Sequence, residues 1–270
     1  MKMTILSMLA GAFAVSAIAS TSKNDDSSIA SPNTYVLVHG AWQAAWVWDT
    51  VRNDLQKEGN KVIVVELPGH GNDKSATHTL SIDVYRDKVI EAISTVNEKV
   101  ILVGHSMGGM VITAVAEKIP AKINKLVYIG AFLPKSGESL ADLAMSDPGS
   151  KLGPSIIPSA DQLTLDVKSD SLAYLFIDDG SPAIKEQLIS NYRAEPAIPF
   201  GNKITLTYDH FGTVSLVYIK TLQDNVISPG LQDRMIAGAG VTTVYTVNTS
   251  HSPFLSQPHE VSKLLLQVAK

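Results

Sequence analysis

Short runs of apolar, β-branched residues alternate with longer amphipathic segments from residue 34 to the end of the chain. The runs predict buried strands at 34–40, 61–67, 99–104, 125–132, 216–224 and 241–251. Apolar residues at helical spacing predict helices at 45–59, 81–96, 107–119 and 258–270. Because apolar strands alternate with helices, we expect an α/β fold in which a mostly parallel sheet is covered by helices on both faces.

This alternation is interrupted between about residues 135 and 212, where prolines, glycines and short helical pieces predominate. A structureless loop of that length is uncommon in a compact domain. We therefore expect a mainly helical cap, inserted over the carboxyl edge of the sheet, where such sheets bind ligands. A separate second domain is the alternative, but strand-like segments resume after residue 212 and favour one domain over 34–270.

The N-terminus has its own pattern, in which Lys2 precedes an apolar run that ends in Ala17-Ile18-Ala19. This layout predicts a secretory signal peptide at 1–19, followed by a flexible lead-in at 20–33. The run is shorter than the roughly 20 residues that span a membrane, and a buried N-terminal helix is the alternative. We expect a periplasmic or secreted protein that is not inserted in a membrane after cleavage.

Composition excludes several classes of function. The chain has 270 residues, a net charge of −4 and scattered basic residues, which argues against a nucleic-acid partner. It has no cysteine, so disulfides, thiolate catalysis and cysteine-based zinc sites are excluded. The acidic pairs Asp25-Asp26 and Asp178-Asp179 lie in loop contexts without further ligands, and we expect no metal.

The segment Gly104-His105-Ser106-Met107-Gly108 fits G-x-S-x-G between a predicted strand and a predicted helix. A sharp strand-to-helix turn of this kind exposes a serine hydroxyl and requires small neighbours. A phosphate-binding loop would instead need a lysine after its glycines, and none follows here. The pattern therefore predicts Ser106 as a nucleophile.

A serine nucleophile needs a base, and the base needs a group that orients it. His251 follows the strand-like run at 241–250 and Asp224 ends the strand at 216–224, so the chain order is serine, aspartate, histidine, as in hydrolases of this architecture. We predict His251 as the base and Asp224 as its orienting acid. Rival bases and acids in weaker positions are His70, which we expect in a loop, His78, His210, His259, Asp209 and Asp233.

Attack on an ester carbonyl creates an oxyanion that two backbone N–H groups stabilise. We expect these donors to be Met107, next to the nucleophile, and Ala41, in a loop that His39 and Gly40 shape; a simple strand-ending turn is the alternative. Residues expected to form an apolar substrate pocket are Trp42, Phe132, Leu133, Leu172, Leu175 and Phe176, although the cap members could simply pack the cap.

The segments YVLVHGAWQAAWVW, VILVGHSMGGM, YIGAFLP, VYIKTLQDNVISPGLQDRMI and TSHSPFL resemble the α/β-hydrolase fold. Within it they are similar to the branch of plant methyl salicylate and methyl jasmonate esterases, hydroxynitrile lyases, and bacterial salicylate-ester or pyrethroid-type esterases. The resemblance runs from Tyr35 to the C-terminus and is loose across the insertion. It implies a cofactor-independent serine carboxylesterase for small hydrophobic esters, aromatic ones included, and supports Asp224 as the acid.

The lyases of this branch carry threonine where this chain has Gly40, glutamate where it has His105, and lysine where it has Ser252. All three are absent, so the resemblance implies an esterase rather than a lyase. Two further alternatives keep the same triad: a small-molecule receptor with little turnover, and acyl transfer to an alcohol or to peroxide.

Overall fold

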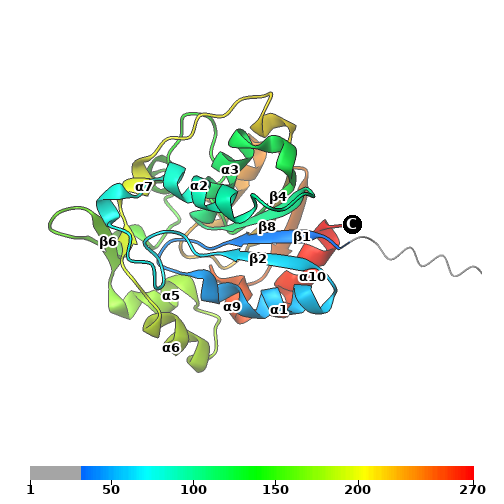
Figure 1. The fold of residues 1–270 in the computed structure, drawn as a ribbon. Helices are drawn as coiled ribbons and strands as arrows, with labels where there is room; N and C mark the ends of the chain where they lie inside the picture. The colour runs from blue at the N-terminus through cyan, green and yellow to red at the C-terminus, as the bar shows by residue number, and fades with distance from the viewer. Residues whose placement is uncertain (1–31) are drawn as a thin grey trace, which may run out of the picture. The chain divides into compact units, whose positions relative to one another are not determined.

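The computed structural model describes residues 32–270, so the signal peptide expected at 1–19 and most of the lead-in lie outside the described residues. A six-stranded sheet in the order β2-β1-β3-β4-β8-β9 forms the centre, and every neighbouring pair is parallel (Figure 1). Its strands are β1 (Thr34–Val38), β2 (Lys61–Val65), β3 (Val100–His105), β4 (Ile123–Ile129), β8 (Ser215–Thr221) and β9 (Thr243–Val247).

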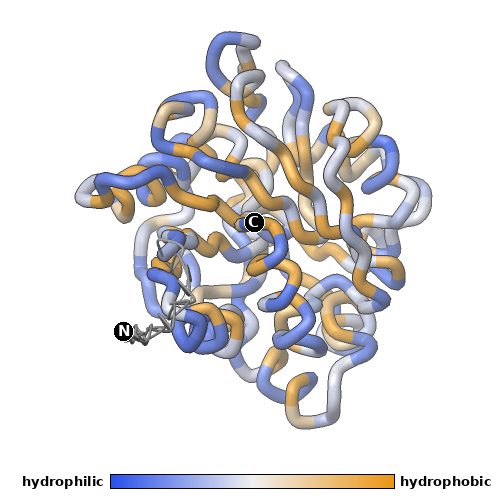
Figure 2. Tube along the Cα trace, turned by 90° about the vertical axis from the view of Figure 1, so that its right-hand side faces the viewer, coloured by the Kyte–Doolittle hydropathy of each residue, from blue (hydrophilic) through white to orange (hydrophobic). Residues whose placement is uncertain are grey.

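Helices cover both faces of this sheet because side chains alternate along each buried strand. In β1, Val36 and Val38 join one core cluster, whereas Tyr35 and Leu37 join the other. The first cluster is covered by α2 (Ile82–Ala92), α3 (Gly108–Lys118) and α8 (Pro229–Gly238), and the second by α1 (Asp49–Lys57), α9 (Pro253–Ser256) and α10 (Pro258–Val268). Figure 2 shows the apolar stretches gathered along the strands in the middle of the molecule.

The predicted α/β-hydrolase architecture is confirmed, including its strands and the helices at its start and end. Ser81 caps α2, with its hydroxyl accepting the Val84 N–H at 3.2 Å. Short 3₁₀ turns connect the elements: η1 (Ala45–Trp48), η2 (Thr77–Thr79), η3 (Pro120–Lys122), η4 (Gly153–Ser155), η5 (Ser169–Ser171) and η6 (Phe211–Thr213).

The insertion between β4 and β8 forms a cap that is less helical than expected. It contains α4 (Leu140–Met145), α5 (Leu172–Phe176), α6 (Pro182–Ser190) and α7 (Ile198–Gly201). It also contains an antiparallel sheet of β5 (Ile156–Pro158), β6 (Thr164–Val167) and β7 (Glu195–Pro196). The turn at 159–162, with Gln162 at φ 58°, reverses the chain between β5 and β6, a hairpin that the short strands did not reveal.

Between residues 32 and 270, no helix is both long enough and apolar enough to cross a membrane.

Candidate active site

Ser106 occupies the sharp turn between β3 and α3, with its backbone in the left-handed region at φ 52°. This conformation is unusual for a residue with a side chain and marks a strained turn. The turn is closed tightly, because a Cβ on Gly104 would lie 2.6 Å from the carbonyl oxygen of Gly108. Glycine is therefore required at this position, and Ser106 is held at the wall of a cavity at the carboxyl edge of the sheet.

Asp224 and His251 lie on the loops that follow β8 and β9, and their side chains meet at that same edge. His251 Nδ1 is 2.8 Å from Asp224 Oδ2, and both residues are almost completely buried. The other carboxylate oxygen of Asp224 accepts the backbone N–H groups of Val226 at 2.8 Å and Ile227 at 2.9 Å. These two N–H donors keep the carboxylate in place. Because its other oxygen, Oδ2, can only accept, Nδ1 of His251 must carry the proton, so that Nε2 is free to act as a base.

The His105 ring supports His251 from the other side. Its Nε2 lies 2.9 Å from the backbone oxygen of His251, and the two ring centroids are 4.5 Å apart. Burial, followed by the neighbouring His251, lowers the pKa of His105 well below its usual value, so His105 is neutral and donates from Nε2. Among the described residues no hydrogen bond joins the Ser106 hydroxyl to His251. Such contacts often tighten only when substrate is bound.

Ala41 and Met107 border the same cavity as Ser106. Met107 directly precedes α3, whose N-terminus favours negative charge. Within residues 32–270 neither the Ala41 nor the Met107 N–H donates a hydrogen bond to a protein group. Both predicted oxyanion donors therefore lie beside the serine without a hydrogen-bond acceptor among the described residues.

The cavity at Ser106 has a volume of about 470 Å³ and is predominantly apolar. Trp42 and Phe132, both predicted as pocket residues, are part of its lining. Most of the rest comes from the cap and includes Leu140, Ala144, Met145, Leu152, Ile156, Leu165 and Phe200, none of which the sequence singled out.

The chain matches the alpha/beta hydrolase family over residues 35–264. It belongs to this family. Putative methylesterase 11 (chloroplastic) of Arabidopsis thaliana is 32% identical over 251 residues, which are 88% of this chain and 64% of that relative. This hydrolase therefore spans less than two thirds of that relative's length. Methylesterase 17 of the same plant is 30% identical over 258 residues, covering 88% of this chain and 92% of the relative.

The predicted branch is also confirmed by its lyase member, since an alpha-hydroxynitrile lyase of Arabidopsis thaliana is 27% identical over 261 residues, 87% of this chain and 96% of the relative. Among solved structures, polyneuridine aldehyde esterase superposes with a TM-score of 0.79 at 24% identity, covering 88% of this chain and 100% of that one. This likeness supports the fold.

Four residues that were expected in the substrate pocket of the hydrolase are not part of the cavity lining: Leu133, Leu172, Leu175 and Phe176. All four are buried in the core. Leu172, Leu175 and Phe176 form the inward face of α5, whereas Leu133 follows β4 and lies against Met235 of α8. Phe176 nevertheless contacts the site, with its ring centroid 5.6 Å from that of Trp42 and 6.0 Å from that of His251. Phe176 therefore packs against the site without lining the cavity.

Most of the rival histidines and aspartates of the hydrolase have partners outside the site. His259 pairs with Asp54 at 2.7 Å in an exposed position, and Asp233 pairs with Lys220 at the surface. His70 is in a loop as expected, but it is buried and pairs with Glu195 of the cap at 2.9 Å, a contact that nothing in the sequence indicated. The three remaining rivals, His78, Asp209 and His210, are exposed to solvent.

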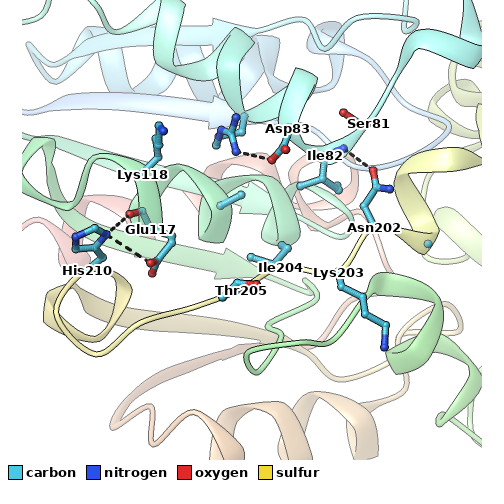
Figure 3. A pocket seen from close by; sticks show the side chains of 13 residues that line it. Ser81, Ile82, Asp83, Glu117, Lys118, Asn202, Lys203, Ile204, Thr205 and His210 are labelled. Atoms are coloured by element: carbon cyan, nitrogen blue, oxygen red, sulfur yellow. Dashed lines mark hydrogen bonds and ion pairs between the residues drawn. The ribbon is translucent and has the colours of Figure 1, made fainter.

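A larger cavity of about 700 Å³ lies between α2, α3 and the segment that follows α7, away from Ser106 (Figure 3). Several of its polar groups contact one another. His210 Nδ1 lies 2.9 Å from the Glu117 backbone oxygen, and Asn202 accepts the Ile82 N–H at 3.0 Å. Within the described part of the hydrolase, this hollow thus contains no paired nucleophile and base. In the described residues no group of three or more His, Asp or Glu side chains is arranged to hold a metal ion.

Proposed function

We propose that this alpha/beta hydrolase is a carboxylic ester hydrolase that works through an acyl-enzyme at Ser106. The observation that carries the proposal is the strained Ser106 turn at the wall of an apolar cavity, together with the His251–Asp224 pair on the loops after β9 and β8. The methylesterase relatives support this chemistry.

In the first half of the reaction, His251 Nε2 takes the proton of the Ser106 hydroxyl as Oγ attacks the ester carbonyl carbon. The carbonyl oxygen becomes an oxyanion and accepts the Ala41 and Met107 N–H groups. His251 then gives its proton to the departing alkoxide, the carbon–oxygen bond to the alcohol breaks, and the acyl group remains on Ser106. Asp224 stabilises the imidazolium and fixes its orientation throughout.

In the second half, water takes the place of the alcohol. His251 removes a proton from the water as the water oxygen attacks the acyl carbon, and a second oxyanion forms. When this intermediate collapses, the bond to Ser106 Oγ breaks, His251 returns the proton to Oγ, and the acid product leaves. No cofactor enters either half of this sequence.

The lining of the cavity favours uncharged, hydrophobic substrates of modest size, aromatic esters included. Among the described residues that line it, Asp147 is the one that carries a charge, and its carboxylate is occupied by the N–H and hydroxyl of Ser228, at 2.8 Å and 2.5 Å. The same described lining holds no cationic side chain for a free carboxylate. A neutral ester is accommodated better than the acid it yields, which helps the product to leave.

The N-terminal pattern supports a further proposal on location. An apolar run that ends in Ala17-Ile18-Ala19 would direct export, and cleavage there would release a periplasmic or secreted enzyme. N-terminal sequencing of protein recovered outside the cytoplasm tests this, and an intact Met1 would contradict it.

Initial rates on nitrophenyl and aryl-methyl esters of increasing acyl size test the function, with wild type and Ser106→Ala assayed side by side. Many turnovers per molecule by wild type, together with a variant reduced on the order of 10⁶-fold in kcat, are expected. Inertness on every ester, or a single burst per molecule, would contradict ester hydrolysis and favour the receptor-like alternative.

A further inference from the structure

A buried carboxylate of the cap contacts the loop that carries Ala41. Glu195, in β7, is completely buried, and its Oε2 accepts the backbone N–H of Trp42 at 2.7 Å. Trp42 follows Ala41, the proposed oxyanion donor, and its own backbone is left-handed at φ 59°. A bulky residue keeps such a conformation only when its surroundings enforce it. The Glu195 carboxylate is therefore one of the contacts that enforce it.

The other contacts of Trp42 also come from the cap. Its indole Nε1 donates to the Leu165 backbone oxygen at 2.9 Å, in the strand that pairs with β7. Its ring packs edge-on against Phe200, with the centroids 5.6 Å apart. The conformation of the loop that carries Ala41 therefore depends on a cap that is docked.

His70 pairs with the buried Glu195 carboxylate. His70 Nδ1 faces the Pro68 backbone oxygen at 3.1 Å, and Nε2 faces Glu195 Oε2 at 2.9 Å. Because both partners are acceptors, both ring nitrogens carry protons and His70 is an imidazolium. Burial alone would lower the pKa of His70, but the Glu195 charge, the hydrogen bonds to Glu195 and Pro68, and the nearby Glu66 charge together outweigh burial and raise the pKa.

The groups around this pair are consistent with that charge state. His39 packs edge-on against His70 at 4.8 Å, and burial, then the His70 charge, lowers its pKa to about 3, so His39 is neutral. Tyr85 packs against the other side of His70 at 5.6 Å, and burial raises its phenol pKa far above the usual value. The remaining charged neighbours are Glu66, Asp73 and Arg193, whose guanidinium donates to the Gly71 and Asp73 backbone oxygens.

The two carboxylate oxygens of Glu195 differ in their contacts. Within the described part of the chain this atom, Oε1, is buried without a hydrogen-bond partner, so the carboxylate concentrates its interactions on Oε2. We propose that Glu195, which is paired with His70, is a positioning residue of the oxyanion hole: it fixes the Trp42 amide and thereby aims the Ala41 N–H at the developing oxyanion. This inference rests on the proposed function. It assigns the cap a part in transition-state stabilisation besides substrate binding.

The test compares two inhibitors on wild type, Glu195→Ala, Glu195→Gln and the control Glu66→Gln. An aryl trifluoromethyl ketone adds to Ser106 Oγ; the C–O bond forms, the serine proton moves to His251, and the carbonyl oxygen becomes an oxyanion. The corresponding trifluoromethyl carbinol fills the same cavity without forming one. Glu66 is a matched control because it accepts the Ala45 N–H of the same loop at 3.2 Å but is 38% exposed.

For Glu195→Ala we expect kcat to fall by about tenfold or more, with KM changed less than about threefold, since misplacing an oxyanion donor affects the transition state. The inhibition constant of the ketone should rise by the factor lost in kcat/KM, while that of the carbinol stays constant. Glu195→Gln, which keeps an acceptor oxygen, should recover part of the loss, and Glu66→Gln should resemble wild type.

An unchanged kcat in Glu195→Ala, or equal weakening of the ketone and the carbinol, would overturn the inference. If Glu195→Ala does not fold, Glu195→Gln and His70→Gln take its place, because both weaken the acceptor for the Trp42 amide; the ketone must again weaken more than the carbinol. Ser106-dependent turnover with unaffected Glu195 variants contradicts this inference alone. An inert wild type contradicts the proposed function, and the inference falls with it.

Discussion

The Asp224 carboxylate holds His251 with one oxygen while its other oxygen accepts two backbone N–H groups. Oδ2 also accepts the Thr221 hydroxyl at 2.7 Å. A carboxylate fixed by this many donors cannot turn away from the imidazole without leaving buried N–H groups unpaired. The loop after β8 therefore sets the tautomer of His251, because it holds the Asp224 carboxylate facing Nδ1.

Replacing Asp224 by asparagine tests that relationship. The substituted side chain would present an amide N–H or a weaker acceptor to His251 Nδ1, so the tautomer with a free Nε2 loses its support. We expect kcat to fall on the order of 10⁴-fold for Asp224→Asn, with little change in KM. Asp233→Asn is the control, because Asp233 pairs with Lys220 at the surface. A loss below about tenfold would contradict Asp224 as the orienting acid.

Gly40 leaves room for the nucleophile. A Cβ at this position would lie 2.7 Å from the Cβ of Ser106 and 2.8 Å from His105 Nδ1. We expect Gly40→Ala to lower kcat about tenfold or more, because displacing reacting groups by a fraction of an ångström is costly. Steady-state kinetics would measure it against Gly201→Ala, whose added Cβ meets nothing within 4 Å. Equal activity of the two variants would show that the close approach at Gly40 is not functional.

The apolar cavity defines which esters enter. Ala144 in α4 is half-buried and belongs to the lining, so Ala144→Phe would fill part of the space of about 470 Å³. We expect kcat/KM for bulky acyl groups to fall by about tenfold or more, while acetate esters change less than about threefold. A uniform loss across the acyl series would place substrate elsewhere.

The His70–Glu195 pair predicts how stability changes with pH. The pKa of His70 is raised above its ordinary 6.5 in the folded state, so folding takes up a proton between that value and the raised one. The contribution is complete below pH 6.5 and is lost as the pH rises through the folded pKa, with a slope of at most about 1.4 kcal/mol per pH unit.

Urea unfolding of wild type and His70→Gln at pH values on both sides of the ordinary histidine pKa, from about 5.5 to about 8.5, measures this contribution. Titrating groups that do not interact with His70 cancel in the difference. The free-energy difference between the two proteins should be largest at the acid end and shrink as the pH rises. A difference that is constant with pH would mean that His70 does not carry the charge.

Much of the fold follows from short-range patterns. Strands β1, β3 and β4 are buried runs of β-branched and aliphatic residues, and period and length alone separate them from the helices. The order of Ser106, Asp224 and His251 along the chain, each after a strand, brings them to one sheet edge because parallel strands end at the same side.

The cap could not be predicted to the same depth. The residues that pack Trp42 lie more than a hundred positions away, and the segment around Glu195 carries no periodicity that indicates burial of a carboxylate. Leu172 and Phe176 have the apolar character of a pocket wall, but tertiary packing decides that they lie behind it. Sequence pattern specifies which residues are buried, and long-range contacts specify what they face.

The central claim is that Ser106 carries the acyl group, and labelling with a nitrophenyl organophosphate tests it most directly. The serine oxygen would form a bond to phosphorus as nitrophenolate leaves, giving a stable analogue of the acyl-enzyme. Peptide mapping after partial reaction should find the phosphoryl group on Ser106 alone, with esterase activity lost in proportion to its occupancy. Full activity in a protein whose Ser106 is fully labelled, or inactivation with the label on another residue, would contradict the account.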